Sequence, residues 1–223
     1  CQPKILEYHK KDKFEYAGAS GGFLDNLGYP FCRGRIFDCL EEDKGQYNDS
    51  REVFWATGAC LFVRASHFFE VGGFDEDFFA HQEEIDLCWR LKNKKYKIFV
   101  EPKSKVYHVG GGTLSVGSPF KTYLNFRNNL YMLFKNLPLR NLFTIISIRL
   151  VLDGIASLTF LNKKKGIKHL IAVIKAHFYF YIEIPKLIRK RRKISQRSSL
   201  VGKTNYSILL KNKAMRIKNF SEL

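Results

Sequence analysis

One acidic stretch, residues 72–90, constrains the fold of this chain more than any other part of the sequence. It reads Gly-Gly-Phe-Asp-Glu-Asp-Phe-Phe-Ala-His-Gln-Glu-Glu-Ile-Asp-Leu-Cys-Trp-Arg, with five carboxylates and one His inside residues 75–84. Its second half has the apolar spacing of a helix that starts near Glu83. On a helical wheel, Glu84 falls inside the apolar arc, so we expect it to face a packed region or a cleft.

The chemistry of this helix start has two interpretations. Partial desolvation would raise the pKa of Glu84 toward the range of a general base, although the helix N-terminus favours the ionised form. Alternatively, Glu83, Glu84 and Asp86 only complement the helix dipole. Asp86 and Arg90 lie four residues apart, which predicts a surface ion pair with a structural role.

Three further motifs surround the acidic helix in a recognisable order. They are Ala-Thr-Gly-Ala-Cys-Leu-Phe-Val-Arg (56–64), Gly-Gly-Phe-Asp-Glu-Asp-Phe-Phe (72–79) and Val-Tyr-His-Val-Gly-Gly-Gly-Thr (106–113). Together with residues 83–90, they resemble the C-terminal half of the inverting family 2 glycosyltransferase domain, of the bacterial rhamnosyltransferase-like type. The resemblance runs from about Gln2 to Leu137. It implies an α/β fold: the C-terminal half of a GT-A (nucleotide-diphospho-sugar transferase) domain with a mixed sheet, followed by membrane-associated helices.

The resemblance also implies a reaction, the transfer of a sugar from a nucleotide-diphosphate donor to a surface-polysaccharide or lipid-linked glycan acceptor. Glu84 stands at the catalytic-base position, which is usually Asp in the family, and Glu83 is the reserve candidate. His108 would be a ligand of Mg²⁺ or Mn²⁺, with a purely structural His as the alternative. The acceptor side would be shaped by Trp55, Gly58, Ala59, Asp75 and Glu76.

The donor side is where the sequence departs from the family. No segment ahead of residue 53 shows the strand–helix alternation of the nucleotide-binding half, with its Asp-x-Asp metal motif. We therefore expect this polypeptide to be inactive alone or to be a piece of a longer enzyme, and an inactive membrane-anchored remnant is the alternative. Residues 14–39 are rich in Gly and aromatic residues, which predicts a partly ordered loop lining a substrate cleft. Its Arg33 and Arg35 suit phosphates, or else they pair with Asp38, Glu41 or Glu42.

The remaining periodicity predicts the other elements of the first 136 residues. A helix over residues 119–136 has polar groups facing inward, and its Asn128 and Asn129 either contact donor or acceptor or make helix–helix hydrogen bonds. A short helix is expected at residues 65–71. Strands are expected at residues 2–8, 53–64, Tyr96–Glu101 and Lys105–Val109, the last two divided at Pro102.

The C-terminal part is apolar and then basic. Residues 142–161 are just long enough to span a membrane, but they carry Arg149 and Asp153, which favours an interfacial or re-entrant helix over a transmembrane one. A second apolar helix at residues 167–184 precedes a polybasic run at 186–193. We therefore predict three segments: an acceptor-side half-domain (1–136), amphipathic membrane-associated helices (137–193) and a basic, mobile tail (194–223).

The charge distribution points to a membrane surface. The chain holds 38 Lys and Arg against 21 Asp and Glu, and residues 163–223 hold 17 of the former against 2 of the latter. This excess accompanies apolar helices and no nucleic-acid-binding motif, so we expect an anionic membrane surface as partner and no nucleic acid. A basic nucleic-acid-binding protein is the alternative. Five Cys without CxxC pairing suit a reducing compartment, and we expect no signal peptide. The expected location is the cytoplasmic face of the inner membrane, peripheral or re-entrant.

Overall fold

The computed structural model describes residues 1–110, 117–162, 165–194 and 201–223. The chain divides into two compact units. The first comprises Cys1–Gly73, Leu87–Gly110 and Ser199–Leu223, and the second comprises Phe74–Asp86 and Gly111–Ser198. The two units differ from the three predicted segments, which were divided at residues 136 and 193. The reason is that the helix over 119–136 packs with the helices that follow it.

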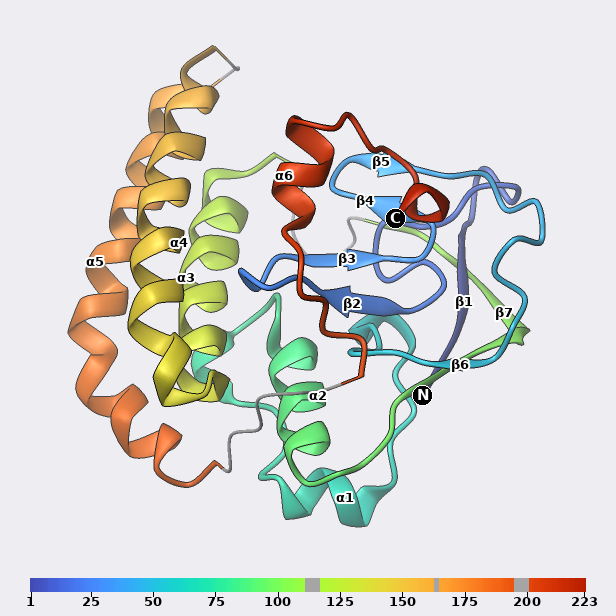
Figure 1. The fold of residues 1–223 in the computed structure, drawn as a ribbon, viewed down its shortest axis with the longest axis horizontal. Coiled ribbons are helices and arrows are strands. Elements are labelled where there is room, and N and C mark those ends of the chain that lie inside the picture. The colour runs from blue at the N-terminus through green and yellow to red at the C-terminus, as the bar shows by residue number, and fades with distance from the viewer. Residues whose placement is uncertain (111–116, 163–164, 195–200) are drawn as a thin grey trace. The chain divides into compact units, whose positions relative to one another are not determined.

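A mixed three-stranded sheet lies in the first unit (Figure 1). Strand β1 (Gln2–Glu7) runs parallel to β7 (Phe99–His108), and β6 (Arg51–Glu52) pairs with β7 in the antiparallel sense. The chain is therefore a mixed α/β protein with a mixed sheet, which is consistent with a GT-A-like fold. The strand predicted at residues 2–8 is confirmed.

Strand β7 corrects the prediction of two strands divided at Pro102. It is a single strand whose register with β1 slips at this point: Pro3 pairs with Glu101, but Lys4 pairs with Lys105. Proline has no N–H to donate to the sheet, so it produces an irregularity in the pairing here and does not end the strand.

Residues 14–39 are not the loop that we predicted. They contain most of a four-stranded antiparallel sheet: β2 (Gly22–Leu24), β3 (Pro30–Cys32), β4 (Arg35–Ile36) and β5 (Cys39–Leu40). Gly34 turns the chain between β3 and β4 with φ +96°, and a Cβ atom there would lie 2.5 Å from Cγ of Phe14. A glycine is needed at this turn, and the Gly-rich composition therefore reflects tight turns in a sheet.

Residues 53–64 do not form the predicted strand either. Val53 to Thr57 are buried but irregular, and Gly58–Cys60 form the 3₁₀ turn η1, capped by Thr57 Oγ1, which accepts from the Ala59 N–H at 3.2 Å. The cap bends the chain out of an extended path before it reaches the apolar residues that follow. The short helix predicted next is confirmed as α1 (Ala65–Glu70).

Helix α2 (Glu83–Asn93) confirms the predicted acidic helix, which begins in the second unit and continues in the first. Trp89 is fully buried and packs edge-on against Phe54, with 5.3 Å between ring centroids. The prediction of a surface pair between Asp86 and Arg90 was wrong, because both residues are buried. Arg90 Nη2 donates to the carbonyl of Gly73 at 2.7 Å.

Three long helices lie side by side in the second unit (Figure 1): α3 (Pro119–Asn136), α4 (Leu139–Thr159), which continues as η3 (Phe160–Asn162), and α5 (Gly166–Arg191). Helix α3 has the predicted bounds, and α4 and α5 contain the two predicted apolar segments. In α4 the buried Arg149 and Asp153 pair with each other at 3.2 Å, so the charged residues are turned inward. By length and composition alone, Leu139–Asn162 is the one described helical segment able to cross a membrane, with mean hydropathy 1.7.

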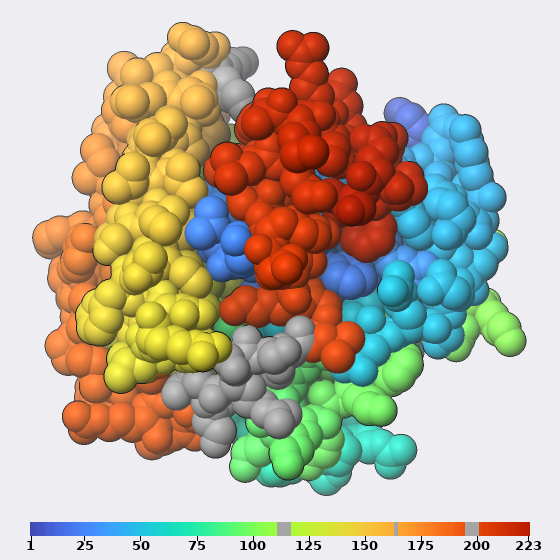
Figure 2. Space-filling view, in the orientation of Figure 1, coloured from blue at the N-terminus to red at the C-terminus, as the bar shows by residue number. Residues whose placement is uncertain are grey.

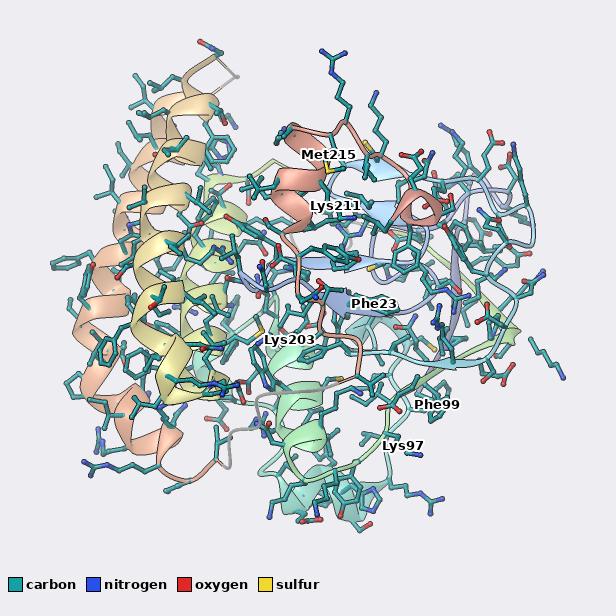
Figure 3. All side chains as sticks on the ribbon, viewed as in Figure 1. Phe23, Lys97, Phe99, Lys203, Lys211 and Met215 are labelled. Carbon is teal, nitrogen blue, oxygen red and sulfur yellow. The ribbon has the colours of Figure 1, made fainter. Side chains whose placement is uncertain are left out.

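Residues 201–223 have regular structure, although we predicted a mobile tail; residues 195–200 lie outside the described part. They include α6 (Ile208–Lys213) and η4 (Phe220–Glu222), and they lie over the β2–β3 region of the first unit (Figure 2). The Leu24 N–H donates to Gly202 O at 3.0 Å. Lys203, labelled in Figure 3, places Nζ 5.3 Å from the centroid of the Trp89 ring. The C-terminal residues are thus part of the first unit.

Asp25 links these C-terminal residues to the four-stranded sheet, and this generates a prediction. Its buried carboxylate accepts from the N–H groups of Leu27 (2.9 Å), Tyr29 (2.7 Å) and Ile208 (2.9 Å). We expect Asp25→Ala to lower the free energy of unfolding by about 2–4 kcal/mol in urea denaturation, because buried donors lose their acceptor. The exposed Asp38→Ala is the control, and an equal loss in both variants would contradict this role.

Candidate active site

The loop ahead of α2 is strained. Residues Phe74–Gln82 include the 3₁₀ turn η2 (Glu76–Phe78) and three non-glycine residues with positive φ: Phe79 (+61°), His81 (+70°) and Gln82 (+69°). Such conformations cost about 1–3 kcal/mol each, and they persist only where the surrounding structure holds them. Backbone strain of this kind gathers at functional sites.

Helix α3 supplies the hydrogen bonds that hold this loop. Asn128 Nδ2 lies 2.9 Å from the carbonyl oxygen of Phe78 and 2.8 Å from those of Ala80 and His81. The next residue, Asn129, donates through Nδ2 to Gln82 Oε1 at 2.9 Å. The two asparagines, for which we predicted ligand contacts or helix–helix hydrogen bonds, therefore bind the loop.

A buried lysine joins the two ends of the same segment. Lys135 on α3, 2% exposed, places Nζ 2.5 Å from Asp75 Oδ2 and 2.9 Å from Asp86 Oδ2. The other oxygen of Asp86 accepts from Asn136 Nδ2 at 2.8 Å. Lys135 and Asp86 thus compensate each other's burial, which neither charge would tolerate alone.

Helix α5 completes this network with two more lysines. Lys190 pairs with Asp75 and, at 2.5 Å, with Asp77, and Lys186 pairs with Asp77 at 2.5 Å. Burial raises the pKa of the Asp75 carboxyl, but the ammonium groups of Lys135 and Lys190 outweigh it and lower that pKa to about 2. Asp75, which we predicted to contact an acceptor, is therefore occupied by lysines. Its neighbour Glu76 is exposed.

Glu83 and Glu84 stand on the first turn of α2, and both are half-buried. Burial raises the pKa of the Glu83 carboxyl, while its own backbone N–H acts in the opposite direction. Within the described part of the chain, Glu83 Oε2 is buried without a hydrogen-bond partner. His81 lies in the same segment, and its pKa is lowered by burial and by the charge of Lys121. Burial therefore favours the protonated form of the Glu83 carboxyl and the neutral form of the His81 imidazole.

The predicted acceptor residues of the first unit differ in accessibility. Trp55 is buried, and its Nε1 donates to the carbonyl of Phe23 at 2.9 Å. Its ring fills the space beside Gly22, where a Cβ atom would lie 2.1 Å from Trp55 Cε2. Trp55 is therefore packed in the core, where its predicted contribution to the acceptor side would be through packing and not through direct exposure. Gly58 and Ala59, in contrast, are exposed in the turn η1.

Arg33 and Arg35 do not offer free guanidinium groups for phosphate. Arg33 is buried and pairs with the Asp49 carboxylate, which was not among the partners that we had considered. Arg35 is also buried, donates to the carbonyl of Phe37 at 3.2 Å and stacks over the Tyr16 ring at 4.4 Å. Both side chains stabilise the four-stranded sheet and its turns.

His108 lies at the end of β7, 31% exposed, with Nδ1 3.5 Å from Oε1 of the buried Glu15. The glycines at 111 and 112 that follow it fall outside the described residues. The sequence does not reveal Glu15 as a partner because it lies 93 positions from His108. The Glu15 N–H donates to Ile5 O of β1 at 3.1 Å, and β1 pairs in parallel with β7, which ends in His108. Among the described residues, no group of three or more His, Cys, Asp or Glu side chains could hold a metal. The pair alone does not make the ligand set of a divalent cation.

Comparison with known proteins gives a family match over most of the chain. The family model described as glycosyltransferase-like family 2 matches residues 12–145. An N-acetylglucosaminyl-diphospho-decaprenol L-rhamnosyltransferase of Mycobacterium tuberculosis is 43% identical over 58 residues, which are 26% of this chain and 19% of that protein. A rhamnosyltransferase of Escherichia coli is 37% identical over 62 residues, 28% of this chain and 23% of that protein.

A low-salt glycan biosynthesis hexosyltransferase of Haloferax volcanii is 27% identical over 85 residues, 38% of this chain and 28% of that protein. The matches thus span between 19% and 28% of the length of these curated relatives. No solved structure matches the chain significantly.

The buried position of Lys135 generates a prediction about stability. Lys135→Met removes the ammonium group that lies 2.9 Å from the fully buried Asp86 carboxylate, so we expect the free energy of unfolding to fall by about 3–5 kcal/mol in urea denaturation. Lys186→Met is the matched control, because its side chain is 44% exposed and such pairs contribute no more than about 1 kcal/mol. Equal losses in the two variants would show that burial of Lys135 is unimportant.

The lowered pKa of Asp75 generates a prediction about pH. A carboxyl whose pKa is lower in the folded than in the unfolded chain adds stability above its ordinary pKa of 3.8, and this is lost as pH falls toward about 2. We expect the thermal midpoint of wild type to drop over this window. The drop should be smaller in Asp75→Asn, measured by circular dichroism. Identical pH profiles for both proteins would refute this contribution.

Proposed function

Since the chain belongs to the glycosyltransferase-like family 2, we propose that it serves the inverting transfer of a sugar from a nucleotide-diphosphate donor to a lipid-linked or surface-polysaccharide glycan. The relatives' names support the acceptor class, since one acts on a decaprenol-linked diphosphate and another in glycan biosynthesis. The observation that carries the proposal is the strained acidic loop. It ends in two half-buried carboxylates, Glu83 and Glu84, at a helix N-terminus.

The proposed role of one of these carboxylates is that of a general base. The acceptor hydroxyl oxygen attacks the anomeric carbon from the side opposite the leaving diphosphate, so the configuration inverts. The carboxylate takes the hydroxyl proton as the new C–O bond forms and the bond to the diphosphate breaks. A base held by a rigid segment needs little reorganisation, and this is the advantage that the tethered loop gives.

We propose Glu84 as the base, because it stands where the resemblance puts it, and Glu83 as the second candidate. The raised pKa of Glu83 supports the second assignment, since a base works best with a pKa near the operating pH. On the acceptor side, the exposed Glu76, Gly58 and Ala59 remain candidates. No step is assigned to a metal, because the described residues lack a ligand set for one.

Substitution of the two glutamates tests this proposal. In the full polypeptide as the cell expresses it, Glu84→Gln keeps the shape but removes the proton acceptor. We expect the transfer rate to fall by about 10²–10⁴, measured with a nucleotide-sugar donor and a lipid-linked acceptor. Glu83→Gln should be milder, and the exposed Glu42→Gln should match wild type. A large loss only in Glu83→Gln would exchange the two roles, and normal transfer in both variants would refute the proposal.

We further propose that the helices of the second unit rest on the cytoplasmic face of an anionic inner membrane, peripherally or re-entrantly. Helix α4 exposes large apolar side chains, among them Phe143 (72% exposed) and Val151 (62%). The polybasic run of α5 contributes less charge than its sequence suggests, because Lys186 and Lys190 are paired with carboxylates. Burial of apolar surface would therefore supply much of the attachment.

Vesicle flotation tests the membrane proposal. We expect the protein to float with vesicles of phosphatidylglycerol and phosphatidylethanolamine, and the double variant Phe143→Asp/Val151→Asp to float several-fold less. The control is Leu210→Asp, which changes an exposed leucine (65%) of the first unit. Full recovery of wild type in the vesicle-free fraction at low salt would refute membrane attachment.

A further inference from the structure

A groove in the second unit, between α3 and α5, has aromatic walls and two lysines. Its volume is about 450 Å³, within the usual range for small-molecule sites. The lining includes Phe120, Tyr123, Lys168, Ile171, Lys175 and Tyr179. None of these residues takes part in the ionic network that holds the acidic loop.

The two lysines of the groove differ from their neighbours on the same helix. Lys186 and Lys190 are engaged by Asp77 and Asp75, whereas the side chains of the exposed Lys168 and Lys175 form no ion pair or hydrogen bond with the described residues. Lys168 and Lys175 lie seven positions apart on the helix, which is about two turns or about 10 Å. Ile171 lies between them, so two long cationic side chains flank an apolar floor.

An unbroken row of aromatic rings connects the groove with the strained loop. The ring of Phe79, 71% exposed, lies 6.1 Å from that of Phe120. Phe120 stacks on Tyr123 at 6.1 Å, and Tyr123 meets Tyr179 edge-on at 5.9 Å. Contiguous exposed aromatic surface of this kind marks a binding site. A ligand that follows it from the groove arrives at the strained loop, which leads directly into Glu83 and Glu84 of α2.

We propose that this groove binds the phosphorylated end of a lipid-linked acceptor, with its diphosphate between Lys168 and Lys175 and its first isoprenoid units against Phe120, Tyr123 and Tyr179. Charge complementarity selects the anion, and the aromatic walls select the adjoining hydrocarbon. A bare sugar would instead need carboxylate or amide partners, which the groove lining lacks. This inference rests on the proposed transferase function and specifies how its acceptor is held.

Calorimetric titration without vesicles tests the groove apart from both transfer and membrane attachment. The probe is farnesyl diphosphate, a short isoprenoid diphosphate, and inorganic diphosphate is the comparison. We expect farnesyl diphosphate to bind at least about tenfold more tightly, because it fills the aromatic part of the groove as well as its cationic part. Equal affinities, or no binding of farnesyl diphosphate, would overturn the proposal.

Substitutions of exposed residues then locate the site. Lys168→Gln/Lys175→Gln should weaken binding of farnesyl diphosphate about tenfold or more, and Ile171→Asp should do the same through the apolar floor. The matched controls are Ile174→Asp on α5 and Lys193→Gln just beyond its end, since both residues are exposed and neither lines the groove. They should bind like wild type.

Binding that is unchanged in the groove variants, or equally weakened in the controls, would overturn the groove assignment, whatever the transfer assay shows. Loss of farnesyl diphosphate binding confined to the groove variants would support it even if Glu84→Gln and Glu83→Gln transferred normally. That second result would refute only the proposed catalytic function.

Discussion

The buried ammonium group of Lys135 is the interaction on which the second unit depends. It bonds to Asp75 near the start of the segment Phe74–Asp86 and to Asp86 at its end, so one side chain closes the loop. With its ends fixed, the loop is held in the middle by Asn128 through three carbonyl oxygens. Backbone strain is then tolerable, and the first turn of α2 is presented in one conformation.

The same network explains why part of the positive charge of the C-terminal region is not available to a partner. Lys186 and Lys190 belong to a polybasic run in the sequence, yet in the fold they neutralise Asp77 and Asp75. Their structural role leaves Lys168 and Lys175 as the open lysines of the α3–α5 groove. On α5, Lys186 and Lys190 therefore hold the acidic loop, whereas Lys168 and Lys175 are the lysines that we propose to bind a ligand.

Local sequence patterns predicted the helices but not the polar network. Residues 119–136 and the acidic helix at Glu83 were recognisable because apolar side chains recur at helical spacing. Residues 14–39 were misjudged, because glycines that permit tight turns resemble those of a loop. The bonds of Lys135 and Lys190 join residues between 49 and 115 positions apart. No local sequence pattern encodes such contacts. A lysine in a predicted helix is expected to be exposed unless the carboxylates that pair with it are known.

The most direct test of the account is hydrogen exchange across the loop in wild type and in Asn128→Leu, which keeps the size of the side chain and removes its donors. If α3 holds the loop, amides of residues 78–82 should exchange at least about tenfold faster in the variant, an opening cost lowered by about 1.4 kcal/mol or more. Amides of β2 and β3 should exchange as before. Unchanged protection of residues 78–82 in a folded Asn128→Leu protein would contradict the claim that α3 organises this site.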